Sequence, residues 1–159
     1  MLRIIIAKCE QGSERETARD LISRTFGSER IERTEYGKPY FPELPELHFN
    51  ISHTTGYAAL AVSDQCVGVD IECLRRIKRI ANKKRFAEWV FTEDERGEAY
   101  DELGFLKIWT RKEAYMKLDG RGLAILRSFS ALNQNEACFI QPYFDGEALC
   151  TVAVAERKK

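Results

Sequence analysis

The 159-residue sequence lacks any apolar run long enough to span a membrane, and its start does not combine a basic segment with the long apolar core of a signal peptide. Only two histidines are present, which gives a zinc site little support. The five cysteines are odd in number and show no C-x-x-C spacing, so reduced thiols are the simplest interpretation. We therefore expect a protein of the cytoplasm with no membrane segment.

The composition, 44% hydrophobic and 31% charged, is ordinary for a globular protein. We expect residues 1–159 to form a single compact unit large enough to bury a core. The net charge is zero but unevenly spread, because seven of the eleven residues from Arg75 to Arg85 are basic and residues 88–102 carry seven acids. This pattern is typical either of solvated helical faces or of a surface that docks an acidic partner. The zero net charge and the lack of a nucleic-acid motif argue against nucleic acid as that partner.

Hydrophobic periodicity predicts a chain of both helices and strands. The alternating segments 57–63 and 149–155 both follow a glycine turn, which supports two related halves. Helices are expected over 13–26, 76–90, 92–103 and 104–118. Strands are expected over 2–8, 47–51, 57–63, 66–72, 127–133, 137–144 and 147–156.

The strand Gly68–Glu72 carries two acids. Because strand residues alternate sides, Asp70 and Glu72 share one face while Val69 and Ile71 point into a core. Two carboxylates at this spacing favour either a Mg²⁺ site or an ordinary solvated strand face.

The helix that follows carries a third acid. Trp109, Glu113 and Lys117 recur every four residues and therefore share one helix face. Glu113 and Lys117 form either an exposed helix pair or, given the neighbouring aromatic residue, part of a half-buried site. Three acids and clustered lysines together suit a Mg²⁺ ion and a phosphate ester.

A third segment precedes both. Gly37 marks a turn that presents Lys38 and Pro39, and prolines stiffen the connector that follows. Ser52 and His53 end an apolar strand, where they are either turn residues or part of a site.

Taken in order, the motifs Tyr36–Pro39, Phe49–His53, Gly68–Glu72 and Trp109–Ala114 resemble those of the 4′-phosphopantetheinyl transferase superfamily. More narrowly, the chain is similar to the surfactin-synthetase-activating, double-domain type, with a shortened N-terminal half. The resemblance implies a 4′-phosphopantetheinyl transferase-like α+β fold, in which two similar halves with antiparallel sheets cover about residues 1–73 and 74–159. We expect a monomer.

Members of this family use Mg²⁺ to transfer the 4′-phosphopantetheine arm of coenzyme A to a serine of an apo acyl or peptidyl carrier protein. The other product is adenosine 3′,5′-bisphosphate. By resemblance, the metal-binding acids are Asp70, Glu72 and Glu113, and Glu95 is a further acid near the metal. The resemblance makes Glu113 and Lys117 the catalytic pair, with Glu113 taking the serine proton and Lys117 contacting phosphate. The residues expected to contact coenzyme A are Lys38, Pro39, Ser52, His53, Lys112 and Lys117.

Physical chemistry agrees with these roles, because a neutral serine hydroxyl is a poor nucleophile and benefits from a carboxylate base. Metal coordination lowers a carboxylate's basicity, so the two roles of Glu113 compete. Two other hypotheses remain: a non-catalytic module of the same fold that binds coenzyme A or a carrier protein, and a Mg²⁺-dependent phosphohydrolase.

Overall fold

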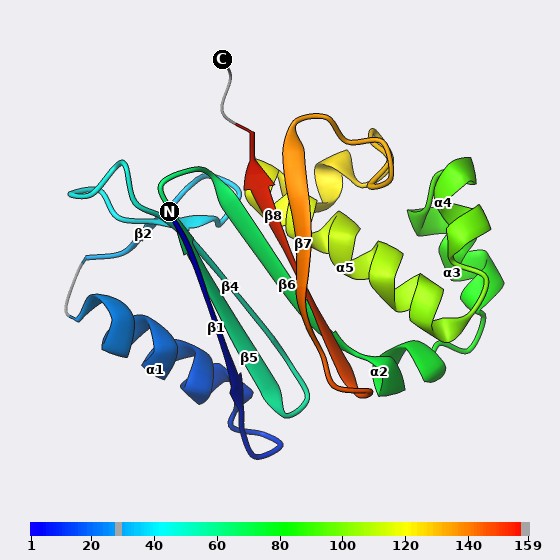
Figure 1. Ribbon diagram of the computed structural model, residues 1–159, viewed down its shortest axis with the longest axis horizontal. Helices are drawn as coiled ribbons and strands as arrows, with labels where there is room; N and C mark the ends of the chain where they lie inside the picture. Colours follow the sequence, from blue (N-terminus) through cyan, green and yellow to red (C-terminus); the bar gives the residue numbers. More distant parts are fainter. Residues whose placement is uncertain (28–29, 157–159) are drawn as a thin grey trace.

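The computed structural model describes residues 1–27 and 30–156, and two three-stranded antiparallel sheets form its centre (Figure 1). The strand order of the first sheet is β1 (Leu2–Lys8), β5 (Tyr57–Ser63) and β4 (His48–Thr54). The order of the second sheet is β6 (Val67–Cys73), β8 (Ala148–Ala155) and β7 (Ala137–Phe144). Helix α1 (Glu14–Phe26) packs on the first sheet and α5 (Glu102–Asp119) on the second. The predicted α+β fold of two similar halves is thus confirmed.

Sheet membership divides the halves earlier than the sequence indicated. The expected boundary lay near residue 73, but strand β6 pairs with β8 and therefore belongs to the second sheet. The division falls in the turn 64–66, between β5 and β6. The strand that carries Asp70 and Glu72 is therefore the first element of the second half, and it lies beside the first half.

Two expected elements differ from the structure. The helix expected over 76–90 is divided into α2 (Leu74–Lys78) and α3 (Lys83–Val90), since Asn82 caps α3 by accepting the N–H of Arg85 at 2.9 Å. The strand expected over 127–133 is an irregular segment. Its Ala131 N–H donates to a Glu95 carboxylate oxygen at 2.6 Å. A side chain therefore satisfies this backbone donor in place of the carbonyl group of a neighbouring strand.

The remaining elements are short. Strands β2 (Glu32–Arg33) and β3 (Pro39–Tyr40) form a small ribbon around a turn in which Gly37 has a φ of +85°. Helix α4 (Glu93–Glu98) begins with a capping box between Thr92 and Glu95. The 3₁₀ helix η1 (Gly122–Ile125) follows the left-handed C-cap Gly120 of α5.

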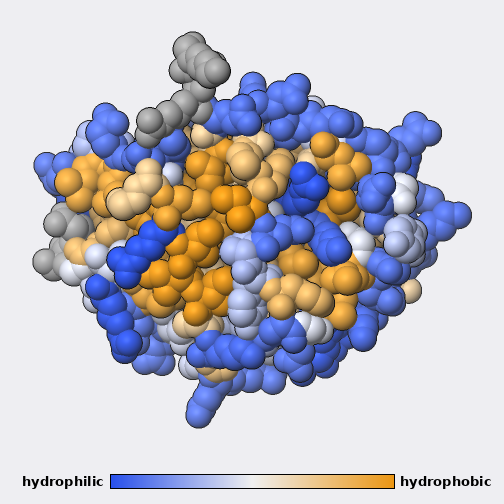
Figure 2. Space-filling model, viewed as in Figure 1, coloured by the Kyte–Doolittle hydropathy of each residue, from blue (hydrophilic) through white to orange (hydrophobic). Residues whose placement is uncertain are grey.

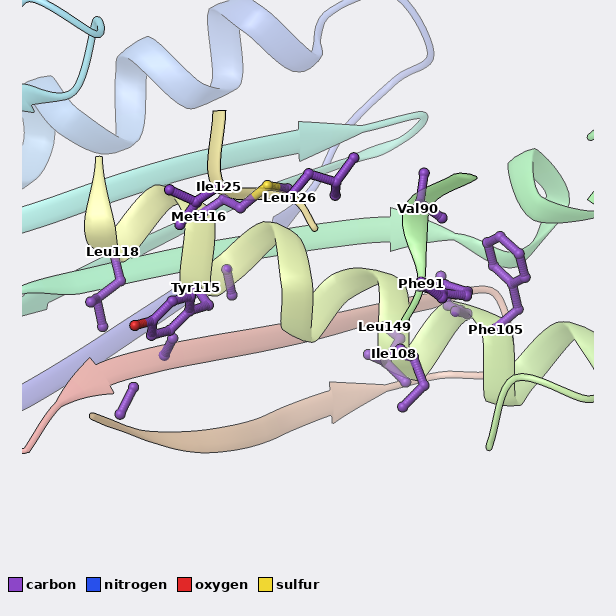
Figure 3. Packing of buried hydrophobic residues seen from close by; sticks show 14 of the residues in the cluster. Val90, Phe91, Phe105, Ile108, Tyr115, Met116, Leu118, Ile125, Leu126 and Leu149 are labelled. Carbon is purple, nitrogen blue, oxygen red and sulfur yellow. The ribbon is translucent and has the colours of Figure 1, made fainter. Parts of the chain in front are cut away.

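The largest core surrounds α5, whose buried side chains pack against the second sheet and the segments that flank the helix. Figure 3 shows this packing, with α5 residues beside Leu149 of β8 and Leu126 after η1. The α5 residues labelled there are Phe105, Ile108, Tyr115, Met116 and Leu118. A separate aromatic cluster of Phe26, Phe41 and Phe49, with ring centroids 4.6–5.3 Å apart, holds α1 on the first sheet.

A third apolar cluster joins the two sheets on the side away from α5. It includes Ala59 and Ala61 of β5, Val69 and Ile71 of β6, and Val152 of β8. Apolar side chains gather over the central strands on the face shown in Figure 2, and hydrophilic residues surround them. Among the described residues, no helix is long and apolar enough to cross a membrane.

Candidate active site

The two sheets meet along β4 and β6, where side chains replace the usual backbone ladder. Asn50 Oδ1 accepts the N–H of Val69 at 3.0 Å, and Ser52 Oγ accepts the N–H of Ile71 at 3.3 Å. The constant offset between partners shows that β4 and β6 run parallel. Alternating polar side chains of one strand therefore satisfy donors that the edge of the next strand would otherwise leave unpaired.

Asp70 lies at the middle of this seam and is buried, rather than on the solvated strand face that one interpretation of the sequence favoured. Its Oδ1 accepts hydrogen bonds from Ser52 Oγ at 3.0 Å and from Lys117 Nζ at 2.7 Å. Lys117 Nζ also donates to Ser52 Oγ at 2.9 Å and to the carbonyl of Val69 at 3.1 Å. All three ammonium protons of Lys117 are thus used, and α5 is tied to both halves.

Glu72 lies two residues further along the same strand face and is also buried. Its Oε1 accepts from Thr54 Oγ1 at 2.5 Å and from the Cys73 N–H at 2.7 Å, and its Oε2 lies 2.9 Å from Arg76 Nη1. Burial raises the pKa of Glu72, while these hydrogen bonds and Arg76 act in the opposite direction. Glu72 is therefore held by both halves of the fold.

Glu113 faces the same region from α5. The helix approaches β6 at Gly68, where an added Cβ would lie 2.0 Å from the carbonyl oxygen of Ala114. This close approach brings Glu113 near the carboxylates of β6. Burial and the charge of Asp70 raise the pKa of Glu113 to about 7, with Lys117 acting in the opposite direction. Within the described part of the chain, Glu113 makes no hydrogen bond or ion pair, so it is the free carboxylate of the set.

A cleft of about 440 Å³ opens beside Glu113 and Lys117. The loop before β3 forms one wall, with Lys38 and Pro39, and Asn50 contributes from β4. Lys38 Nζ donates to the carbonyl of Leu118 at 2.5 Å, and burial lowers the pKa of Lys38. The other lining residues are Arg33, Tyr36, Gly37, Ile51, Met116, Gly120, Gly122 and Leu123. The cleft thus combines lysines and an arginine with one free carboxylate, a composition suited to a phosphate-containing ligand.

Comparison with known proteins identifies the family. Residues 66–154 match the family model described as the 4′-phosphopantetheinyl transferase superfamily. The chain belongs to this superfamily. It is 34% identical over 122 residues to the 4′-phosphopantetheinyl transferase Sfp of Bacillus subtilis, a match that covers 70% of this chain and 53% of Sfp. It is 41% identical over 123 residues to the transferase AcpT of Escherichia coli, covering 69% of this chain and 60% of AcpT.

The chain thus spans just over half the length of these curated relatives. The predicted relationship to the phosphopantetheinyl transferases is confirmed. In this superfamily member, Lys38, Pro39, Glu113 and Lys117 line one cleft, and Ser52, Asp70 and Glu72 lie in the seam beside it.

His53 lies elsewhere. Because it alternates with Ser52 along β4, its exposed side chain points away from the seam. His53 lines a separate cavity of about 370 Å³ together with Glu14 and Arg76. Since Arg76 also binds Glu72, this cavity adjoins the far end of the seam.

Lys112, expected from the resemblance to contact coenzyme A, does not line the cleft in this structure. The side chain is fully buried, and its Nζ lies 3.0 and 2.8 Å from the two carboxylate oxygens of Glu95 and 2.9 Å from the carbonyl oxygen of Phe129. Adjacent helix residues are turned by about 100°, so Lys112 faces the core when Glu113 faces the cleft. Glu95 is likewise internal, because it caps α4 and bonds Ala131. The pair fixes α4 and α5 to the segment near Ala131.

Sequence reasoning did not single out the side chains of Asn50 and Thr54, nor the pairing of Arg76 with Glu72. Asn50 and Thr54 share the strand face of Ser52, as their spacing along β4 allows, and each bonds β6. Arg76 follows Glu72 by four residues, the spacing of a local ion pair. The two-residue alternation of polar side chains in an otherwise apolar strand was the available signal.

Whether the site can bind a metal ion depends on the number and type of its ligand side chains. Among residues 1–27 and 30–156, no group of three or more His, Cys, Asp or Glu side chains lies close enough to hold a metal as the structure stands. Instead, Lys117 forms an ion pair with Asp70, and Arg76 forms an ion pair with Glu72. The donor chemistry nevertheless fits Mg²⁺, because all three acids offer hard oxygen ligands. The negative charges of Asp70 and Glu72 also disfavour ionisation of Glu113, and an added cation would relieve that repulsion.

Proposed function

We propose that this protein transfers the 4′-phosphopantetheine group of coenzyme A to a serine of an apo acyl or peptidyl carrier protein. The Ser Oγ–P bond forms, the pyrophosphate P–O bond breaks, and adenosine 3′,5′-bisphosphate leaves. Family membership supports the reaction class. The observation that carries the proposal is the free, half-buried Glu113 beside Lys117 in a cleft, with a pKa of about 7.

Glu113 serves as the general base in this proposal. A carboxylate with a pKa near neutrality is still substantially ionised at pH 7 and is a stronger base than an ordinary glutamate. It would take the proton of the carrier serine as the hydroxyl oxygen attacks phosphorus. Lys117, beside Glu113 on the same face of α5, would offset the charge that grows on the leaving phosphate.

Coenzyme A would be held by both walls of the seam. Lys38 and Pro39 line the cleft with Glu113, so Lys38 would contact a phosphate of the co-substrate. Ser52 lies in the seam, and His53 with Arg76 lines the adjoining cavity, which would receive another part of the molecule. We leave Lys112 out of this set because it is fully buried.

Asp70 and Glu72 would hold Mg²⁺, with Glu113 beside it as the base, and a bound Mg²⁺ would neutralise charge on the pyrophosphate oxygens. Lys117 Nζ lies 2.7 Å from Asp70 Oδ1, so Lys117 would share the charge of Asp70 with the cation and face the phosphate in the cleft.

The carrier protein would dock on the basic helix α2. Arg75, Arg76, Lys78 and Arg79 are exposed there, close to the end of the seam where Arg76 binds Glu72. An acidic carrier surface complements this charge. We further propose that the protein acts as a monomer in the cytoplasm, which agrees with its five free thiols.

The experiment that tests the function is the intact mass of an apo carrier protein after incubation with this protein, coenzyme A and Mg²⁺. A gain of one phosphopantetheine group, abolished by EDTA and by Glu113→Gln, supports the transferase. Coenzyme A binding without any gain across acyl and peptidyl carriers would favour a binding module. Cleavage of coenzyme A without carrier labelling would favour a phosphohydrolase.

A further inference from the structure

Trp89 on α3 is unusually exposed for a tryptophan. The residue is 55% exposed, whereas tryptophan side chains are highly buried on average. Its ring is nevertheless held in place, because it packs edge-on against the ring of Phe86, with the two centroids 6.0 Å apart. Trp89 therefore presents a fixed apolar group to solvent.

Phe86 connects Trp89 to the face of α5 that carries Glu113. The Phe86 ring also packs edge-on against Trp109, at a centroid distance of 5.5 Å. Trp109 precedes Glu113 by four residues and shares its helix face. A row of aromatic side chains thus runs from α5 beside Glu113 to the exposed ring of Trp89. Since Phe86 and Trp109 are partly buried against the α5 core, Trp89 is the outer end of an apolar surface and not an isolated apolar residue.

Positive charge accompanies this aromatic row. Helices α2 and α3 both lie beside the end of α5 at which that helix begins (Figure 1). The segment Arg75–Arg85, which contains α2 and the start of α3, carries seven basic residues and no acid. Arg85 is exposed and lies four residues before Trp89, on the same face of α3. An acidic helical surface with an apolar recess would complement both the charge and the ring.

The side of α3 that faces α4 is different. Lys84 and Glu88 line a cavity of about 840 Å³ there, together with Tyr100, which is 83% exposed. Lys83 forms an ion pair with Glu102 across the same cavity, at 3.1 Å. Charges of both signs therefore oppose one another on this side. Tyr100 is a matched control for Trp89, because it is an exposed aromatic residue on a surface without an excess of positive charge.

We propose that Trp89 is the apolar anchor of the carrier protein, with its ring inserted between apolar side chains on an acidic surface of the carrier. This inference rests on the proposed transferase function and deepens it, since that function assigns only the charge of α2 to docking. A carrier held at Trp89 would cover the aromatic row that leads to Glu113, the proposed base for its serine. Buried tryptophans commonly dominate the affinity of protein interfaces, whereas charges at the rim act mainly on association.

Steady-state loading tests the anchor apart from the chemistry. Trp89→Ala should raise the KM for an apo carrier by about 30-fold, since loss of an aromatic anchor has an effect of this size. The KM for coenzyme A and the kcat at saturating carrier should stay unchanged. Trp89→Phe keeps an aromatic ring and should recover most of the affinity. Tyr100→Ala should match wild type, because Tyr100 lies at the cavity of mixed charge.

Fluorescence reports docking without turnover. The chain has two tryptophans, Trp89 and Trp109, and their emission can be followed while a tryptophan-free apo carrier protein is added without coenzyme A. Burial of the exposed Trp89 ring should shift the emission to shorter wavelength, and Trp89→Phe should abolish the shift. Vesicles of phosphatidylglycerol and phosphatidylcholine provide the competing partner, since tryptophan beside basic residues is also typical of membrane-surface helices.

Three results would overturn the anchor while leaving the proposed function in place. The first is loading by Trp89→Ala with a wild-type KM for the carrier, and the second is an equal rise in the KM for coenzyme A. The third is an emission shift with the vesicles and none with a carrier that the wild type loads. If the wild type loaded no acyl or peptidyl carrier, the proposed function would fail and the anchor with it.

Discussion

Lys117 and Asp70 form an ion pair across the junction of α5 and β6, with Nζ 2.7 Å from Oδ1. The lysine contacts both halves, since the same ammonium also binds Ser52 of β4. The ammonium of Lys117 thereby balances the charge of the buried carboxylate of Asp70.

Replacement of Lys117 by methionine should therefore affect both activity and stability. Transfer to the carrier should fall by about 10²–10³-fold, because the leaving phosphate loses a cation. Unfolding should become easier by about 1–3 kcal/mol, since the buried carboxylate of Asp70 loses a partner. The measurements are carrier loading by intact mass and urea denaturation. Lys107→Met, an exposed position on the same helix, is the matched control. Unchanged loading by Lys117→Met would exclude this lysine from the reaction.

Glu113 should make stability depend on pH in the metal-free protein. Its pKa is raised in the folded state from 4.5 to about 7, so folding favours the protonated carboxyl. Stability should therefore be unaffected by this group below about pH 4, fall as the pH rises from 4.5 to 7, and stay lower above pH 7. Glu113→Gln should be more stable than wild type at pH 8 by about 1–3 kcal/mol and similar at pH 4.

The measurement is the free energy of unfolding in EDTA at several pH values. Added Mg²⁺ should narrow the difference at pH 8, because a bound cation relieves the repulsion among the three carboxylates. A difference between wild type and Glu113→Gln that is the same at pH 4 and pH 8 would contradict the raised pKa.

The basic helix α2 offers a test of carrier docking. Reversing charge with Arg75→Glu and Lys78→Glu should raise the KM for the carrier by about tenfold and leave the KM for coenzyme A unchanged, because rim charges act mainly on association with the oppositely charged partner. The same number of reversals at Arg24 and Lys107, both exposed, should have little effect. Equal increases in both KM values would argue against α2 as the docking surface.

The sequence predicted which side chains of the motifs share a face more accurately than it predicted which neighbouring elements cover those faces. Alternation along β6 correctly placed Val69 and Ile71 in a core, and helical spacing placed Glu113 and Lys117 together. The burial of Asp70 could not be foreseen, because it depends on α5 and β4 covering its strand face from distant parts of the chain. Local periodicity describes a face of an element and does not reveal which neighbour covers it.

The division of the helix expected over 76–90 has a different cause. The composition of the basic segment favours a continuous helix. In the structure, however, α2 ends at Lys78 and α3 begins after the N-cap residue Asn82. The partner of Lys112 could not be foreseen for a similar reason. The resemblance led us to expect a phosphate contact, and only the fold shows that the neighbour of Lys112 in the core is Glu95.

The buried ion pair between Lys112 and Glu95 should contribute to the stability of the protein. Lys112→Met should destabilise the protein by about 3–5 kcal/mol, because Glu95 is left as a buried charge without its cation. Adding Glu95→Gln to that variant should restore part of the loss. Arg24→Met breaks the exposed pair with Asp20 and should cost less than about 1 kcal/mol. Thermal unfolding distinguishes these cases. If Lys112→Met kept wild-type stability but bound coenzyme A weakly, the structural role would be wrong.

Gly68 sets the distance between β6 and α5 and thereby the position of Glu113 relative to Asp70. An added Cβ would lie 2.0 Å from the carbonyl oxygen of Ala114 and 2.4 Å from the amide nitrogen of Leu118, both of them backbone atoms that cannot rotate away. Gly68→Ala should therefore push the helix outward, destabilise the protein by about 2–4 kcal/mol and lower carrier loading.

Gly97 provides the matched control, because a Cβ there meets nothing within 4 Å and the residue is an exposed position of α4. Gly97→Ala should stabilise the protein by up to about 1 kcal/mol, since alanine has the higher helix propensity, and should leave loading unchanged. Chemical denaturation and carrier loading measured on both variants give the comparison. Tolerance of alanine at Gly68 with full activity would mean that α5 does not need this close contact to bring Glu113 to the cleft.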